Sequence, residues 1–166
     1  GDVGANAPPR LNPNVEIRPS MDIGNLKERI CIDYGGTLQI EIADDGPEAL
    51  KNLLKRMEWV VCSAEEFVRE SREISASEAI LLLAATLYKG MAYSIECMPL
   101  VQSREYATKF VECFGEEGRF FTTCDVPDHE EAGIGAWRAV TKHTFESVLY
   151  GKNGKQAALI VVVDED

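Results

Sequence analysis

The segment TFESVLYGKNGKQAALIVVV, residues 144–163, decides the fold class of this chain. Two runs rich in apolar and β-branched residues, 144–150 and 156–163, flank a short polar segment at 151–155. An Asn-Gly pair inside such a short connection is a strong signal for a β-hairpin. Residues 157–163 are almost continuously apolar, which is typical of a central strand that is covered on both faces. The segment therefore predicts a C-terminal hairpin whose second strand lies inside a sheet.

A second hairpin is predicted near the start of the chain. Residues 29–34 and 37–42 flank Gly35 and Gly36, and apolar and polar residues alternate along the second of these runs. Alternation with a period of two indicates a strand with one buried face. Two glycines between two strands suit a tight turn.

Four helices are predicted between the hairpins. The sequence Asp44-Asp45-Gly46-Pro47 supplies an acidic capping residue and a proline for the first turn of one helix. Ser63 and Ser75 each precede a glutamate by three residues, which is the spacing of a capping box. The second box leads into 79–88, which is apolar on every side and is expected to be the central buried helix. Ser103 is expected to cap a fourth helix that ends before Gly115.

The weaker segments complete the predicted order. Residues 59–62 and 91–98 are each short and apolar enough for a strand, 118–126 is a further strand candidate, and 127–135 is expected to be a loop. This order of elements does not alternate regularly between strand and helix. It predicts an α+β fold, with an antiparallel sheet built from an N-terminal and a C-terminal hairpin and about four helices packed on it.

The length of 166 residues suits one domain, which we place at 21–166. Residues 1–20 contain four of the seven prolines and little periodicity, so an extended proline-rich tail is expected there. Met21 would suit a native start with a leader before it. Two alternatives for the tail are a short edge strand at 14–18 and a peptide that docks on a groove of this chain or of another copy.

The charge of the chain narrows the classes of partner. There are 28 acidic and 17 basic residues, which give a formal charge of -11. Such a field repels nucleic-acid phosphates and anionic membrane surfaces, so neither is an expected partner. It attracts basic protein surfaces. The five cysteines are widely spaced and include no C-x-x-C pair, which favours reduced thiols and a cytoplasmic location.

One short motif suggests phosphate chemistry. The segment Ile32-Asp33-Tyr34-Gly35-Gly36-Thr37-Leu38 resembles the first motif of the haloacid-dehalogenase phosphatases, an apolar strand that ends in D-x-D-G-T. The resemblance implies that Asp33 is the nucleophile, and Gly35 stands where that family has its second acid. The same segment is similar to the D-x-G-G-T phosphate loop of sugar kinases of the actin-like class, whose glycines let backbone N–H groups approach phosphate. A phosphate-handling enzyme that uses Asp33 is therefore the alternative function, and a glycine hairpin with Asp33 near its tip is the structural alternative.

The main functional prediction concerns the acidic stretch 112–131, which holds seven acidic residues against Arg119 alone and includes Phe120 and Phe121. Aromatic side chains among carboxylates suit a basic protein surface, because rings contribute most of the contact energy and acids guide the encounter. We therefore expect an acidic protein-binding module, such as an inhibitor, an immunity-type protein or a secretion chaperone, that masks a basic surface of its partner. The expected contact residues are Glu116, Glu117, Asp125, Asp128, Glu130, Glu131 and Trp137.

Two alternatives and one further expectation accompany this prediction. The acidic stretch could be a solvated loop with its aromatic rings in the core, and either the run 156–163 or the tail could pair between subunits of an oligomer. The acidic runs lack the alternating ligand spacing of a calcium loop, so no metal and no cofactor are expected.

Overall fold

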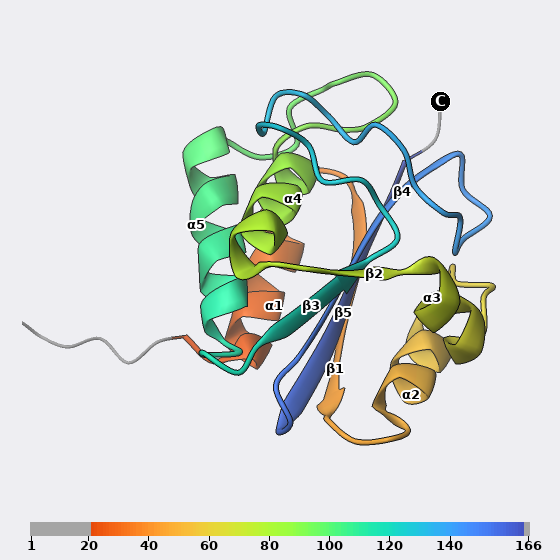
Figure 1. Ribbon diagram of the computed structural model, residues 1–166. Coiled ribbons are helices and arrows are strands. Elements are labelled where there is room, and N and C mark those ends of the chain that lie inside the picture. Colours follow the sequence, from red (N-terminus) through yellow and green to blue (C-terminus); the bar gives the residue numbers. More distant parts are fainter. Residues whose placement is uncertain (1–20, 165–166) are drawn as a thin grey trace, which may run out of the picture.

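A five-stranded antiparallel sheet, with strand order β1-β5-β4-β3-β2, forms the centre of the computed structural model, which describes residues 21–164 (Figure 1). The strands are β1 Thr37–Asp44, β2 Arg72–Ile74, β3 Arg119–Thr122, β4 Phe145–Lys152 and β5 Gln156–Asp164. The helices within the described range are α1 Ile23–Asp33, α2 Ala49–Arg56, α3 Ala64–Glu70, α4 Ala76–Tyr88 and α5 Leu100–Glu112. The predicted α+β class is confirmed, and the sheet joins strands from both ends of the described chain.

The C-terminal hairpin is confirmed. β4 pairs with β5 along its whole length, and β5 pairs on its other side with β1. All residues from 157 to 163 are buried, as expected for a central strand with both faces covered. In the connection, Gly154 adopts a positive φ of 88°, and the side-chain oxygen of Asn153 accepts from the backbone N–H of Lys155 and Gln156.

Helices cover both faces of the sheet. Successive side chains of a strand point to opposite faces, so Ile160 packs into the core beneath α1, α4 and α5, whereas Leu159 and Val161 pack beneath α2 and α3. Figure 1 shows α1, α4 and α5 on one side of the strands and α2 and α3 on the other. The protein is thus built in three layers.

Serine caps begin two of the helices as predicted, whereas the acidic cap predicted at Asp44 and Asp45 is wrong: Asp44 ends β1, and α2 begins at Ala49 without a side-chain cap. Ser75 and Glu78 form the predicted capping box at the start of α4, and Ser63 caps α3. α5 begins earlier than predicted: Pro99 occupies the capping position, and Ser103 lies inside the helix, where its hydroxyl donates to the carbonyl of Pro99 at 3.0 Å. The proline suits this boundary because its ring fixes φ and it has no N–H to leave unpaired.

The prediction of an N-terminal hairpin is wrong in its first arm, because residues 29–33 belong to α1. Asp22 caps this helix by accepting from the backbone N–H of Asn25 at 2.8 Å, and Ile23, Leu26 and Ile30 form its buried face. Their spacing follows the helical period rather than the period of two. Gly35 and Gly36 therefore connect a helix to β1.

Three further segments differ from their predicted form. Residues 59–62 and 91–98 form no strand and contribute only isolated bridges, Val60 with Thr141 and Lys89 with Glu96. The strand predicted over 118–126 is limited to β3. The predictions for residues 1–20 lie outside the described residues. In the described range, the helices are too short or too polar to cross a membrane.

Candidate functional site

A long loop, residues 123–144, connects β3 to β4 and extends beyond one end of the sheet (Figure 1). Its two arms are paired by backbone hydrogen bonds, from Asp125 to Ala136 and from Arg138 to Thr123, each at 2.8 Å. A turn closes the tip, where the N–H of Ala132 donates to the carbonyl of His129. The loop is therefore an ordered ribbon with a defined tip.

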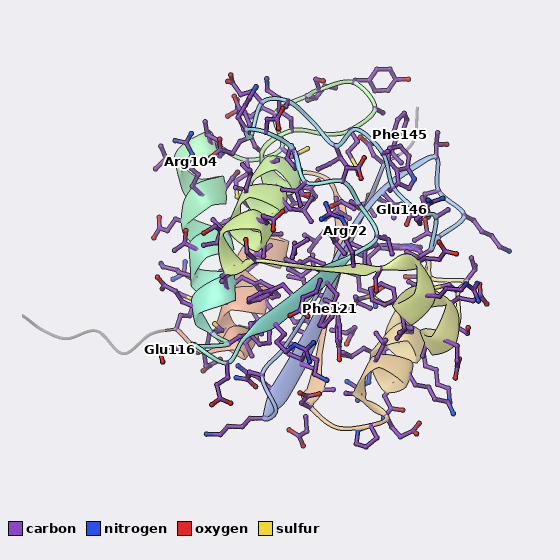
Figure 2. All side chains as sticks on the ribbon, in the orientation of Figure 1. Arg72, Arg104, Glu116, Phe121, Phe145 and Glu146 are labelled. Carbon is purple, nitrogen blue, oxygen red and sulfur yellow. The ribbon has the colours of Figure 1, made fainter. Side chains whose placement is uncertain are left out.

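A buried carboxylate fixes the second arm of this ribbon. Glu146 of β4 is fully buried, and one of its oxygens accepts from the backbone N–H of Val140 at 2.8 Å. The other oxygen accepts from both the backbone N–H and the hydroxyl of Thr141, at 2.9 and 2.8 Å. Figure 2 shows Glu146 beside Phe145 near the end of the sheet that carries the loop. Sequence reasoning missed this residue. The only sign of it in the sequence is a single acidic residue inside an otherwise apolar strand.

A second loop, residues 89–99, joins α4 to α5 and is also tightly folded. The backbone N–H of Gly90 donates a hydrogen bond to the carbonyl of Ile95 at 2.7 Å, and the N–H of Ser94 donates to the carbonyl of Gly90 at 3.0 Å. Ser94 has a positive φ of 55°. The N–H of Ala92 donates to Asp164 at the end of β5. This compact turn leaves the side chains of Tyr93 and Ile95 exposed, each by 65%.

The two loops meet at one end of the molecule. Residues 89–91 and 130–134 line a common hollow of about 200 Å³. Arg104 of α5 binds Glu130 at 2.7 Å, and this hydrogen bond and charge lower the pKa of the Glu130 carboxyl. We call six exposed side chains of these two loops the loop-end surface: Tyr93, Ile95, Glu96, Asp125, Asp128 and Glu131. The exposed cations of the 123–144 loop, Arg138 and Lys142, are not members of this set.

The structure brings together only part of the predicted contact set. Asp125, Asp128, Glu130 and Glu131 all lie on the 123–144 loop. Glu116 and Glu117 lie in the turn between α5 and β3, and Figure 2 shows Glu116 at the opposite end of α5 from Arg104, which binds Glu130. The seven residues therefore do not form one continuous surface.

The aromatic rings are less exposed than the prediction required. Phe120 is buried in the core beneath α4 and α5, and Phe121 points to the opposite face of the sheet, where it is half-buried. Trp137 is half-buried against the core, with its ring 5.7 Å from that of Phe145. Exposed apolar side chains at this end of the molecule come instead from the neighbouring 89–99 loop, as Tyr93 and Ile95.

Sequence reasoning missed Tyr93 and Ile95 because residues 91–98 were expected to form a strand of the sheet. The alternation of Met91, Tyr93 and Ile95 between Gly90 and Pro99 fits a strand, so the sequence gives no signal of their exposure. In the structure Met91 is half-buried, whereas Tyr93 and Ile95 are exposed.

Asp33 lies in a different setting from the one its motif implies. It is the last residue of α1 rather than the end of a strand, and it accepts hydrogen bonds from Gln102, at 2.9 Å, and from the hydroxyl of Tyr106. Burial and the bond to Asp33 raise the pKa of Tyr106. The N–H of Gly35 donates to the carbonyl of Cys97. These contacts join α1 to α5 and to the 89–99 loop.

Metal-ligating side chains do not gather in the described structure. Across residues 21–164, no group of three or more His, Cys, Asp or Glu side chains lies close enough to hold a metal ion. The five cysteines are free thiols, and burial raises the pKa of Cys62, Cys113 and Cys124.

Comparison with known proteins adds no relative. The chain matches no protein-family model, no curated protein and no solved structure. Its function is therefore argued from the geometry of the loop-end surface.

Proposed function

We propose that this chain is an acidic protein-binding module whose loop-end surface docks on a basic surface of a partner protein. The observation that carries the proposal is that the 89–99 loop, which exposes the apolar side chains of Tyr93 and Ile95, meets the acidic tip of the 123–144 loop around a shared hollow. An inhibitor, an immunity-type protein or a secretion chaperone would use such a surface to mask its partner. The free cysteines favour action in the cytoplasm.

The carboxylates of this surface are available to a partner. Within residues 21–164, no Lys, Arg or His nitrogen lies within 4.0 Å of the carboxylates of Asp125, Asp128 or Glu131, whereas Glu130 is already paired with Arg104. Together with the overall charge of -11, these groups would guide a basic surface toward this end of the molecule and set its orientation.

The apolar side chains would provide most of the contact energy. Tyrosine is enriched among the residues that dominate interface energetics. Tyr93 and Ile95 sit on a turn that is held by Asp164, and the acidic tip sits on a ribbon that is held by Glu146. Loops that are ordered before binding lose little conformational freedom when the complex forms.

The proposal is tested by affinity capture from native lysate with three variants. Tyr93→Ala combined with Ile95→Ala removes the apolar contacts, and Asp128→Lys combined with Glu131→Lys reverses the charge of the tip. Glu116→Lys combined with Glu117→Lys makes the same change of net charge at the opposite end of the molecule, and serves as the matched control. Proteins retained by the wild-type chain are identified by mass spectrometry along a salt gradient.

We expect the wild-type chain and the control to retain the same basic protein, and both loop-end variants to lose it. Loss of Tyr93 alone should weaken the purified complex by about 30-fold, the effect of a central interface residue worth about 2 kcal/mol. Equal loss in the control and in the charge-reversed tip, with the partner retained by the Tyr93→Ala and Ile95→Ala variant, would show that only net charge matters. Retention of the same proteins by all three variants would exclude the loop-end surface as the docking site.

A further inference from the structure

A groove of about 760 Å³ lies between α2, α3 and the strands β2, β3 and β4. It shares no residue with the loop-end surface and lies on the sheet face opposite α1, α4 and α5. Its volume is within the range of about 300–1,000 Å³ that is usual for small-molecule sites. The groove is therefore large enough for a ligand of its own.

Aromatic rings form the floor of this groove. The ring centres of Phe121 and Tyr150 are 5.9 Å apart with planes tilted by 37°, and Phe67 meets Tyr150 edge-on at 6.2 Å. The guanidinium of Arg119, which binds Glu73, lies over the Phe121 ring at 5.3 Å and fixes its position. The labelled side chain of Phe121 can be followed from β3 in Figure 2.

The walls add apolar surface. Leu50 of α2 and Val68 of α3 both line the groove, and Val68 is 66% exposed. α2 and α3 pack over the central strands and leave Phe121 half-buried between them and the sheet edge. A flat apolar ligand could thus lie on the rings and between the two helices.

One polar group of the lining is open to the groove. Tyr150 lines the groove, and although the residue as a whole is only 6% exposed, its hydroxyl is not among the buried unpaired polar atoms of residues 21–164. Protein groups in the same range form no hydrogen bond with this hydroxyl, so it is free to donate to a molecule in the groove. Burial, assisted by the charge of Asp45, raises the pKa of Tyr150 to about 12. At neutral pH the hydroxyl is therefore a hydrogen-bond donor.

The charges around the groove disfavour an anionic ligand. The ammonium of Lys51 lies 3.8 Å from Glu48, and that of Lys152 lies 3.7 Å from Asp45. Each lysine is thus balanced by a carboxylate, and Glu65 adds a further negative charge to the lining. We propose that the groove binds a small neutral molecule whose aromatic ring packs on Phe121 and whose carbonyl oxygen, or equivalent acceptor, receives the hydroxyl of Tyr150.

The test uses two probes and two variants in an NMR titration. Acetophenone has an aromatic ring and a carbonyl acceptor, and cyclohexyl methyl ketone keeps the acceptor but lacks the aromatic ring. Tyr150→Phe removes only the hydroxyl in the groove. Tyr93→Phe removes an exposed tyrosine hydroxyl in the 89–99 loop and is the matched control.

We expect acetophenone to bind with a dissociation constant on the order of 1–10 mM, as ordinary ligand efficiency gives for a molecule of this size. Its shifts should map to Val68 and Phe121. Tyr150→Phe should weaken this binding about fivefold, the effect of one neutral hydrogen bond, and Tyr93→Phe should leave it unchanged. Equal affinity in Tyr150→Phe and wild type, tighter binding of the cyclohexyl ketone, or the absence of shifts in the groove would each overturn the proposal.

Discussion

Replacement of Glu146 by glutamine should destabilise the protein strongly although it changes the side-chain volume very little. The two carboxylate oxygens of Glu146 accept three hydrogen bonds, from the backbone of Val140 and from the backbone and hydroxyl of Thr141. Glutamine has one acceptor oxygen, so its amide nitrogen would face a backbone N–H that also needs an acceptor. At least one buried donor then loses its partner.

The size of the effect follows from these contacts. Hydrogen bonds to a charged group contribute about 1.5–3 kcal/mol each, and the cheaper burial of a neutral amide offsets part of the loss. We expect Glu146→Gln to lower the free energy of unfolding by about 3 kcal/mol. With a urea dependence of about 2 kcal/mol per molar, the midpoint of unfolding would fall by about 1.5 M.

Urea titrations followed by circular dichroism give this midpoint directly. Glu105→Gln is the matched control, because Glu105 is exposed on α5 and only forms an ion pair with Lys109; its midpoint should stay within about 0.3 M of wild type. Thr141→Val removes the hydroxyl bond to Glu146 and also the acceptor of the backbone N–H of His143, and should fall between the two, at about 2 kcal/mol. If Glu146→Gln unfolds at the same urea concentration as wild type, the carboxylate is not what anchors the 123–144 loop.

Three other measurements probe separate parts of the structure. The pKa of Tyr150 is raised to about 12 from its usual value near 10, so this tyrosine ionises in the unfolded chain before it ionises in the folded one. Between pH 10 and pH 12, the free energy of unfolding of wild type should therefore fall by about 2 kcal/mol more than that of Tyr150→Phe. Parallel pH profiles of the two proteins would contradict this. Gly151→Ala places a Cβ 3.1 Å from the ring of Phe114 and should lower the free energy of unfolding by about 1–3 kcal/mol in urea titrations. Gly135→Ala is the control: its Cβ meets no neighbour within 4 Å, so the free energy of unfolding should change by less than about 0.5 kcal/mol. Ser75→Ala breaks the capping box of α4 and should lower the thermal midpoint in calorimetry by an amount equivalent to about 1 kcal/mol; an unchanged midpoint would show that the cap contributes nothing.

The parts of the fold that were predicted correctly depend on local chemistry. The Asn153-Gly154 turn and the serine caps of α3 and α4 each act over a few residues, so their sequence is sufficient to identify them. Residues 29–33 fit two periods at once: Ile30 and Ile32 alternate like a strand, while Leu26 and Ile30 repeat like a helix. Packing of α1 on β1 and α5 selects the helix and leaves Ile32 78% exposed.

The candidate site depended on contacts that the sequence does not display. Negative charge was evident from composition, but Phe120 and Phe121 separate to opposite faces of β3 because strand side chains alternate. The partners of Glu146 are mostly backbone N–H groups, which every residue carries and which therefore give no sequence signal. Exposure of Tyr93 likewise follows from the way the 89–99 loop folds back on Asp164.

Hydrogen exchange of the complex with the captured partner tests the central claim most directly. If the loop-end surface is the docking site, amide exchange should slow at 89–98 and 124–136, while the turn at 113–118 keeps its rate. Slowing at 113–118 with no change in either loop would contradict the account, because it would place the partner at the opposite end of the molecule.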